Sequence, residues 1–296
     1  MQGTGFKNYY CDPLASFIYE GMPRTNLEEV TVSKEEEKLL CEYAVIKNKV
    51  AGVSEVNIAC SEPSIVLELL KKYGLKGRAV VSDISKCSDG TIFHIKDILS
   101  LSEQQLQDIA LEVGKRKIPC MLTFGRTLDQ MGQIDKLYGM SPARFLEEEG
   151  FLDRECLILG GNYLDKDDLN ILSQYDARVV VTPRSDMLLG RGFINLSPLK
   201  SQGLALGFAT DIHPYTDMLA EVYLAAGQTA NLMHDAKAVQ FEELLKFLYD
   251  GSPPAMEVNL ELQALTGVYM VYDEELEERS VQLFNKLIPL INRLQK

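Results

Sequence analysis

Short apolar stretches alternate along this chain with longer segments of helical pattern. Several of the short stretches, such as Arg178–Thr182, are apolar almost throughout. Such stretches are typical of parallel strands that are buried on both faces. The pattern predicts eight strands: Phe6–Tyr10, Glu55–Cys60, Arg78–Asp83, Thr91–His94, Ile118–Phe124, Cys156–Gly160, Arg178–Thr182 and Leu204–Thr210.

The segments between these strands carry helix signals. Ser33 precedes Glu36 at the spacing of a capping box, and other segments end at a glycine or ahead of a proline. The predicted helices are Ser33–Lys49, Ser61–Tyr73, Ser102–Lys117, Asp165–Tyr175, Tyr215–Met233 and Phe241–Tyr249. Eight strands with intervening helices over about 250 residues fit a (β/α)8 TIM barrel of the α/β class. A doubly wound sheet is the alternative, but no GxGxxG or Walker-type loop follows a predicted strand.

The pattern changes after residue 250. Gly251–Pro254 reads as a break, so we divide the chain into a barrel, 1–250, and a C-terminal extension, 251–296. Asp273–Lys296 predicts one amphipathic helix packed on the barrel, and we expect it to close the barrel bottom; a role as an interaction helix is the alternative. Its apolar positions recur at helical spacing: Leu276, Val281, Phe284, Leu287, Ile288 and Ile291.

Composition narrows the possible partners and the location. With 30 basic and 43 acidic residues among 296, the net charge is −13, which argues against nucleic acid and anionic membrane surfaces as partners. No apolar run is long enough to span a membrane, and Met1–Tyr10 lacks the features of a signal peptide. The six cysteines form no CxxC motif, which favours reduced thiols and a cytoplasmic location. The chain has only three histidines.

Four ordered motifs resemble the metal-dependent amidohydrolase superfamily. The likeness is to its aminohydrolase branch, which contains guanine deaminase, adenosylhomocysteine and adenosine-type deaminases, and triazine chlorohydrolases. It extends over roughly residues 5–235. In the family these motifs are a strand ending in His, a CPxSN…GxG turn, a GTD strand end and a DMxxExxLAA helix. Here they fall on Leu157–Leu169, Val179–Gly192, Gly203–Asp211 and Asp217–Ala226.

The resemblance implies a TIM barrel with a flanking β-sandwich and one divalent metal ion that activates water for attack on a C–N bond. In this chain we expect most or all of the sandwich to be missing and a C-terminal helix to be added. The family holds its metal with an HxH on the first strand, with histidines after the fifth and sixth strands, and with an aspartate after the eighth. The equivalent positions here are Tyr10, Asp12, Thr123, Gly160 and Asp211.

Only Asp211, at the position of the family's proton shuttle, keeps its family identity among these five. Arg126 stands where the family has a glutamate that moves protons, and a guanidinium cannot give up its proton in a useful pH range. We therefore expect no metal cofactor. We predict instead that Arg126 pairs with Asp211 or Asp12 and fills the space of the metal, because a buried carboxylate needs a partner.

Four further residues are candidates for ligand binding. His94 aligns with a family histidine that helps to bind substrate, although a satisfied structural histidine is the alternative. His213 follows Asp211 at the same end of the barrel, where it either lines a pocket or forms a turn. Arg184 and Ser185 lie in the turn that positions substrate in the family; they bind a small anion or form solvated surface.

Three functions remain open. The first is a non-catalytic amidohydrolase-like protein that binds a small ligand or a protein partner, as a homodimer or with a related subunit. The second is an active hydrolase or deaminase of cyclic amidines (purine, pyrimidine or triazine type), with zinc or iron and a rearranged site of Asp12, His94, Asp211 and His213. The third is a purely structural subunit whose side chains fill the barrel mouth, leaving no pocket at the strand ends.

Overall fold

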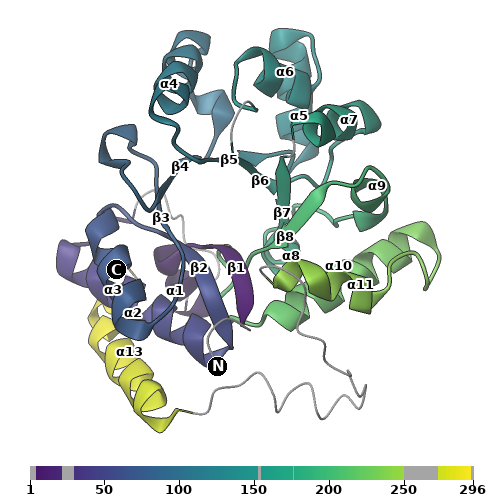
Figure 1. Ribbon diagram of the computed structural model, residues 1–296. Coiled ribbons are helices and arrows are strands. Elements are labelled where there is room, and N and C mark those ends of the chain that lie inside the picture. Colours follow the sequence, from purple (N-terminus) through teal and green to yellow (C-terminus); the bar gives the residue numbers. More distant parts are fainter. Residues whose placement is uncertain (1–4, 22–29, 153–154, 176, 250–272, 295–296) are drawn as a thin grey trace.

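Eight parallel strands form a ring in chain order in the computed structural model (Figure 1), which describes residues 5–21, 30–152, 155–175, 177–249 and 273–294. Each strand pairs in parallel with the next. The predicted (β/α)8 barrel is therefore confirmed. The strands are β1 (Phe6–Cys11), β2 (Val53–Ala59), β3 (Ala79–Val81), β4 (Thr91–Ile95), β5 (Cys120–Phe124), β6 (Cys156–Gly160), β7 (Arg178–Val181) and β8 (Ala205–Phe208).

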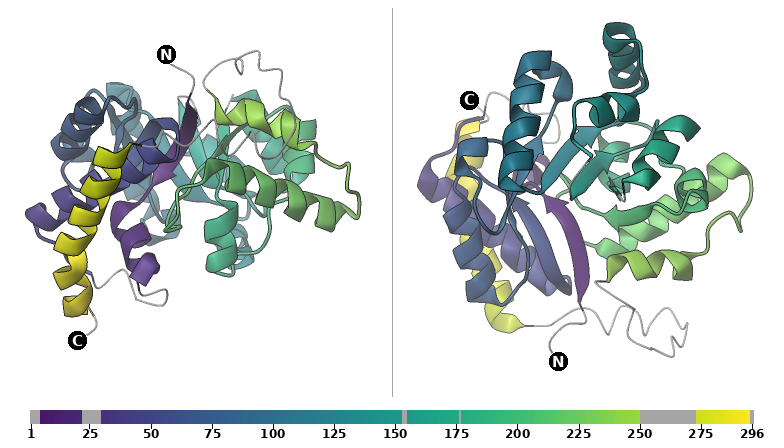
Figure 2. Two further views of the ribbon diagram at one scale, coloured as in Figure 1. Left: turned by 90° about the horizontal axis from the view of Figure 1, so that it is seen from below. Right: turned by 45° about the horizontal axis from the view of Figure 1, so that its top comes forward.

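Helices surround the strands on the outside of the ring (Figure 2). The longer ones are α2 (Lys34–Val50), α3 (Pro63–Tyr73), α4 (Glu103–Arg116), α5 (Leu128–Tyr138), α7 (Lys166–Gln174), α10 (Met218–Met233) and α13 (Glu274–Leu294). The shorter ones are α1 (Pro13–Gly21), α6 (Pro142–Glu148), α8 (Pro183–Leu188), α9 (Leu196–Ser201), α11 (Phe241–Leu245) and the 3-10 turns η2 (Ile84–Lys86), η3 (Ile98–Ser100) and η4 (Lys246–Leu248). The predicted capping box begins α2: Ser33 Oγ accepts a hydrogen bond from the Glu36 amide, and Glu36 accepts one from the Ser33 amide.

The ring is joined between β1 and the residues that follow β8. The Asp211 amide donates to the Tyr10 carbonyl at 3.0 Å, and the Asp12 amide donates to the Asp211 carbonyl at 3.0 Å. Buried Asn8 adds side-chain bonds across the seam, since its Nδ2 lies 2.9 Å from Thr210 Oγ1 and its Oδ1 accepts from the Thr210 amide. Asp211 takes a left-handed backbone conformation, with φ of 50°. The seam therefore fixes the backbone on both sides of the Asp211 carboxylate.

Side chains fill the interior of the barrel, as is usual for this fold. The strands contribute to this interior cluster Tyr9, Tyr10, Val80, Ile92, Met121, Leu157, Leu159, Val180 and Ala209. A larger apolar cluster lies between the strands and the helices. Because the interior is packed, open space at the strand ends is confined to the mouth.

Helix α13 packs against α1 and α2 on the outside of the barrel (Figure 1), where Leu283 and Leu287 are buried with Phe17 and Ile46. It does not close the barrel bottom, so that expectation is wrong. Val281 points away from this contact and its side chain is 61% exposed. The predicted break at 251–254 lies outside the described residues.

No helix in the described ranges combines the length and the apolar character that crossing a membrane requires.

Shortening a buried side chain of α13 should destabilise the fold far more than shortening an exposed side chain of the same helix. Leu287 is 1% exposed, so Leu287→Ala should lower the free energy of unfolding by about 2–4 kcal/mol through the cavity that it leaves. The matched control is Val281→Ala, which should change it by less than about 0.5 kcal/mol. Urea denaturation measures both values. Equal losses would contradict the packing of α13 on α2.

Candidate functional site

The C-terminal ends of the strands bring most of the predicted site residues to one face of the barrel. Tyr10 and Asp12 come from the end of β1, His94 from β4 and Thr123 from β5. The remaining positions lie at or just beyond the ends of later strands: Arg126, Gly160 and Asp211. This is the face on which TIM-barrel enzymes carry their chemistry, and we call it the barrel mouth.

Arg126 is the centre of a buried ion cluster in the mouth. Its Nη2 atom donates to Asp211 Oδ2 at 2.6 Å and to Thr182 Oγ1 at 2.6 Å. Its Nε atom lies 3.4 Å from Asp186 Oδ1. Of the two carboxylates that the sequence offered as partners, Asp211 is therefore the one that Arg126 contacts. Burial works to lower the pKa of Arg126, but the carboxylates of Asp211 and Asp186 raise it above its usual value, so this side chain is a permanent cation.

The side chain of Arg126 occupies the space that a side chain at Gly160 would need. A Cβ atom on Gly160 would lie 2.3 Å from Arg126 Cγ and 2.6 Å from the Phe124 carbonyl oxygen. The φ angle of Gly160 is +127°, a conformation that favours glycine. Glycine at the end of β6 and arginine after β5 are therefore compatible with each other, whereas a histidine at 160 is incompatible with this position of Arg126.

Two members of the cluster, Asp186 and Arg191, were missed by the sequence reasoning. Arg191 Nη1 lies 3.7 Å from Asp186 Oδ1 and 3.6 Å from Asp211 Oδ2. Thr182 and Asn162 each donate a hydrogen bond to Asp186 Oδ2, at 3.1 and 3.0 Å. Both missed residues lie in the Val179–Gly192 motif, where they follow a strand end as Arg126 does. Their place in that motif was the signal from which they could have been found. Two arginines and two aspartates give the cluster no net charge.

His94 is a buried neutral histidine beside the cluster. Its Nε2 atom lies 2.8 Å from Thr123 Oγ1, and its ring packs edge-on against Tyr10 with ring centroids 5.2 Å apart. Burial, with a smaller contribution from the nearby Lys96 ammonium, lowers the pKa of His94 to about 3. The Nδ1 atom is buried and has no hydrogen-bond partner. Burial also raises the pKa of Tyr10 well above its usual value, so the phenol stays protonated.

A cavity of about 610 Å³ opens at the strand ends beside His94. It is lined by residues from the β1–β4 half of the barrel, including Asp12, His94 and Lys96. Asp12 and Lys96 face each other at 3.7 Å. The purely structural alternative predicts no pocket here, and this cavity counts against it.

The other predicted binding residues have protein partners away from this cavity. Arg184 Nε donates to buried Glu221 at 2.8 Å, and its Nη2 donates to the carbonyls of Tyr215 and Asp217. Ser185 is buried and its hydroxyl donates to the Thr210 carbonyl at 2.8 Å. His213 Nδ1 lies 3.3 Å from the Tyr215 carbonyl oxygen, and burial lowers its pKa to about 4. None of these three residues lines the cavity beside His94.

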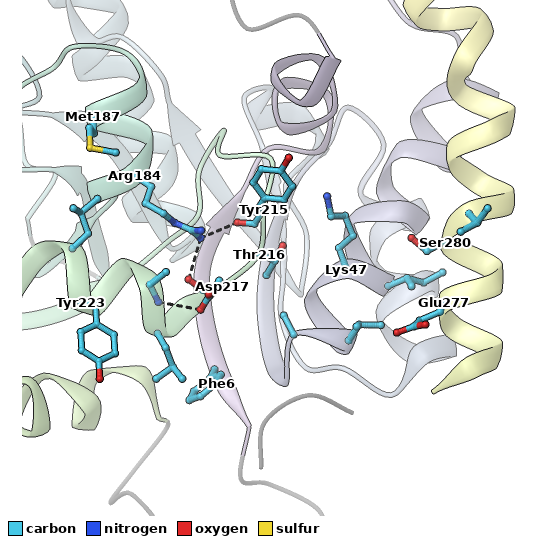
Figure 3. Close-up of a pocket in the computed structure, with 17 residues that line it drawn as sticks. Phe6, Lys47, Arg184, Met187, Tyr215, Thr216, Asp217, Tyr223, Glu277 and Ser280 are labelled. Atoms are coloured by element: carbon cyan, nitrogen blue, oxygen red, sulfur yellow. Dashed lines mark hydrogen bonds between the residues drawn. The ribbon is translucent and has the colours of Figure 1, made fainter. Parts of the chain in front are cut away.

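Arg184 and Tyr215 line instead a groove of about 1070 Å³ on the outside of the barrel. Figure 3 shows it between α10, which carries Tyr223, and the side formed by α2 and α13, with Lys47 and Glu277. The groove is larger than the cavity in the mouth. However, none of the four charged residues of the ion cluster lines it.

Known proteins are similar to this chain in part of the sequence and in the fold. The chain is 37% identical over 126 residues to the 5-methylthioadenosine/S-adenosylhomocysteine deaminase of Thermococcus onnurineus, a match that covers 42% of this chain and 29% of that protein. The deaminase of the same name from Thermococcus kodakarensis is 37% identical over 135 residues, which cover 45% of this chain and 29% of that protein. No family model matches the sequence.

Solved structures share the fold at lower sequence identity. A zinc-bound adenosine deaminase from Xanthomonas campestris superposes with a TM-score of 0.71 at 16% identity, covering 83% of this chain and 65% of that one. A guanine deaminase from C. acetobutylicum with bound guanine gives a TM-score of 0.67 at 13% identity, covering 83% and 71%. The resemblance to the aminohydrolase branch is confirmed. The chain nevertheless matches less than a third of the length of these curated aminohydrolase relatives.

A side chain at Gly160 should be strongly unfavourable because two obstacles meet it. Gly160→Ala should lose about 2 kcal/mol or more of stability, through overpacking against Arg126 and Phe124 in addition to backbone strain. Gly139→Ala is the control, because Gly139 also has a positive φ, of 65°, but nothing within 4 Å of a Cβ atom. Urea denaturation compares the two. The same comparison in an Arg126→Ala background should show a smaller difference; an unchanged difference would mean that Arg126 does not fill this space.

Acid should destabilise the protein through His94. Its pKa is about 3 when folded and 6.5 when exposed, so between these pH values the unfolded chain binds a proton that the folded chain does not. Stability from this residue is therefore full above pH 6.5 and falls as the pH drops toward 3. The free energy of unfolding of each protein is compared with its own value at pH 7. In this window, wild type should lose about 1.4 kcal/mol more per pH unit than His94→Phe. Denaturation curves at pH 7, 6 and 5 test this, and parallel slopes would refute it.

Proposed function

We propose that this chain is a non-catalytic amidohydrolase-like protein that binds a small ligand at its barrel mouth. The observation that carries the proposal is the position of Arg126. Its guanidinium lies 2.6 Å from Asp211 and its stem fills the space above Gly160, where the resemblance places a metal-binding histidine. A permanent cation in that place opposes the binding of a second cation and cannot act as a general acid or base.

The residues at the remaining ligand positions do not fit a catalytic metal. A catalytic zinc takes three protein ligands of nitrogen, oxygen or sulfur type and keeps one position for water. Gly160 offers no side chain, Tyr10 is a buried protonated phenol, and the Thr123 hydroxyl is bonded to His94. In the described part of the chain, no group of three or more His, Cys, Asp and Glu residues is arranged to hold a metal ion. We therefore derive no reaction step through a metal.

A ligand-binding role is supported by the cavity beside His94. Its volume of about 610 Å³ is within the range of small-molecule sites. Its lining combines apolar side chains with a few polar groups, among them Asp12, His94 and Lys96. A cavity of this size with a mixed lining is what a binding site without catalysis needs.

The second candidate is an active hydrolase of C–N bonds in cyclic amidines. It is favoured by the relatives, which carry the name 5-methylthioadenosine/S-adenosylhomocysteine deaminase. Asp12, His94 and Asp211 would serve such a site, with zinc or iron. Two observations weigh against it: His213 does not line the cavity beside His94, and Asp211 is paired with Arg126.

Metal content and deaminase activity separate the two candidates. We expect purified protein to contain far less than one zinc, iron or manganese per chain by elemental analysis. We also expect no ammonia release from 5-methylthioadenosine, S-adenosylhomocysteine, adenosine, guanine or a triazine, with or without added metal. A full equivalent of metal that survives dialysis against a mild chelator would contradict the proposal. So would ammonia release that is abolished by Asp211→Asn.

A further inference from the structure

The lining of the cavity beside His94 is both apolar and polar. Its apolar part includes Leu14 of α1, Val32 ahead of α2, Leu40 of α2, and Ala59, Val80 and Val81 of the strands. Its polar part includes Asp12, Glu37, Ser61, Ser82, Asp83, His94 and Lys96. A ligand that fills this cavity therefore has an apolar portion as well as polar groups.

Most charged side chains of the cavity are already bonded within the protein. Lys86 Nζ donates to Glu62 at 2.6 Å and to the Ser61 carbonyl at 2.7 Å. Glu37 accepts from the Ser61 hydroxyl at 2.6 Å, and Asp83 accepts from the amide and hydroxyl of Ser85. These residues have little bonding capacity left for a ligand.

Asp12 and Lys96 keep more bonding capacity. Asp12 Oδ1 accepts a hydrogen bond from the Ala15 amide at 3.0 Å, which leaves Oδ2. Their oppositely charged ends, Asp12 Oδ2 and Lys96 Nζ, lie 3.7 Å apart, which is too far for a hydrogen bond. The side chain of Lys96 is 60% exposed and that of Asp12 is 18% exposed. The cavity thus offers one carboxylate oxygen and one ammonium group, side by side and loosely paired. Two groups of opposite charge on a ligand would match them.

His94 lies in the wall of the cavity and is only 3% exposed. Its Nδ1 atom has no hydrogen-bond partner, but protein atoms enclose it, so it does not face a ligand in this conformation. The ligand class is therefore argued from the charged groups of the cavity alone.

We propose that the cavity binds a small zwitterion with an apolar side group, of the α-amino acid type. Its ammonium group pairs with Asp12, its carboxylate pairs with Lys96, and its apolar side group lies against Leu14, Val32 and Leu40. The inference rests on the proposed ligand-binding function and names the class of ligand.

Calorimetric titration of the full chain with single amino acids tests the proposal. The probes are L-leucine, L-methionine and L-phenylalanine, each compared with its N-acetyl derivative and its amide. At least one free amino acid should bind, and removing either charge should weaken binding at least tenfold. No binding of any free amino acid at millimolar concentration would overturn the proposal, as would equal binding of the charged and blocked forms.

Variants locate the two charges. Asp12→Asn should weaken binding of the free amino acid and abolish the penalty of N-acetylation, whereas Lys96→Gln should abolish the penalty of the amide. Lys86→Gln is the control, because Lys86 lines the same cavity but is paired with Glu62. A loss in Lys86→Gln equal to that in Lys96→Gln would overturn the placement. Circular dichroism confirms that each variant is folded.

The outcome is independent of the test of the proposed function. Failure of amino acids to bind would leave the metal content and the absence of deaminase activity unchanged, so only the ligand class would fall. Conversely, a full equivalent of metal or ammonia release would refute the non-catalytic role whether or not amino acids bind.

Discussion

The contact between the Arg126 guanidinium and the Asp211 carboxylate constrains the whole barrel mouth. Both groups are almost fully buried, and each would be costly to bury alone. Removing one partner of such a pair typically costs about 3–5 kcal/mol, because the other is left as an unpaired buried charge. The contact also requires Gly160, since a Cβ atom there would collide with the stem of Arg126. The arginine, the aspartate and the glycine, from three different strand ends, therefore depend on one another.

This pair divides the mouth into two halves. On the side of β5–β8, Arg126, Asp186, Arg191 and Asp211 fill the space with a neutral ion cluster. On the side of β1–β4 the mouth stays open as the cavity lined by Asp12, His94 and Lys96. The hydrogen bond between His94 of β4 and Thr123 of β5 lies at the boundary. The ligand site that we propose therefore lies in the half that the arginine leaves free.

Sequence patterns predicted the strands well and the side-chain partners only in part. All eight strands were found, several of them because they are short, nearly continuous apolar runs. Helices α1, α5, α6, α8 and α9 were missed; all of them except α5 are shorter than ten residues. The sequence placed Arg126 near two carboxylates but could not choose between Asp12 and Asp211, because that choice depends on backbone positions fixed by the seam between β1 and Asp211. The sequence also did not reveal the role of Gly160, because the need for a glycine there depends on the position of the Arg126 side chain.

The neutrality of the ion cluster bears on what the open half can recognise. A resident divalent metal would give the mouth a strong positive field and would favour anionic or electron-rich ligand groups. Here the two arginines are balanced by two aspartates, and His94 is neutral because of burial. The nearby charges that a ligand meets are then mainly those of Asp12 and Lys96, of opposite sign and 3.7 Å apart. One arginine, placed where the resemblance expects a proton-transferring acid, therefore bears on both proposals: the absence of a metal and the choice of a ligand by paired charges.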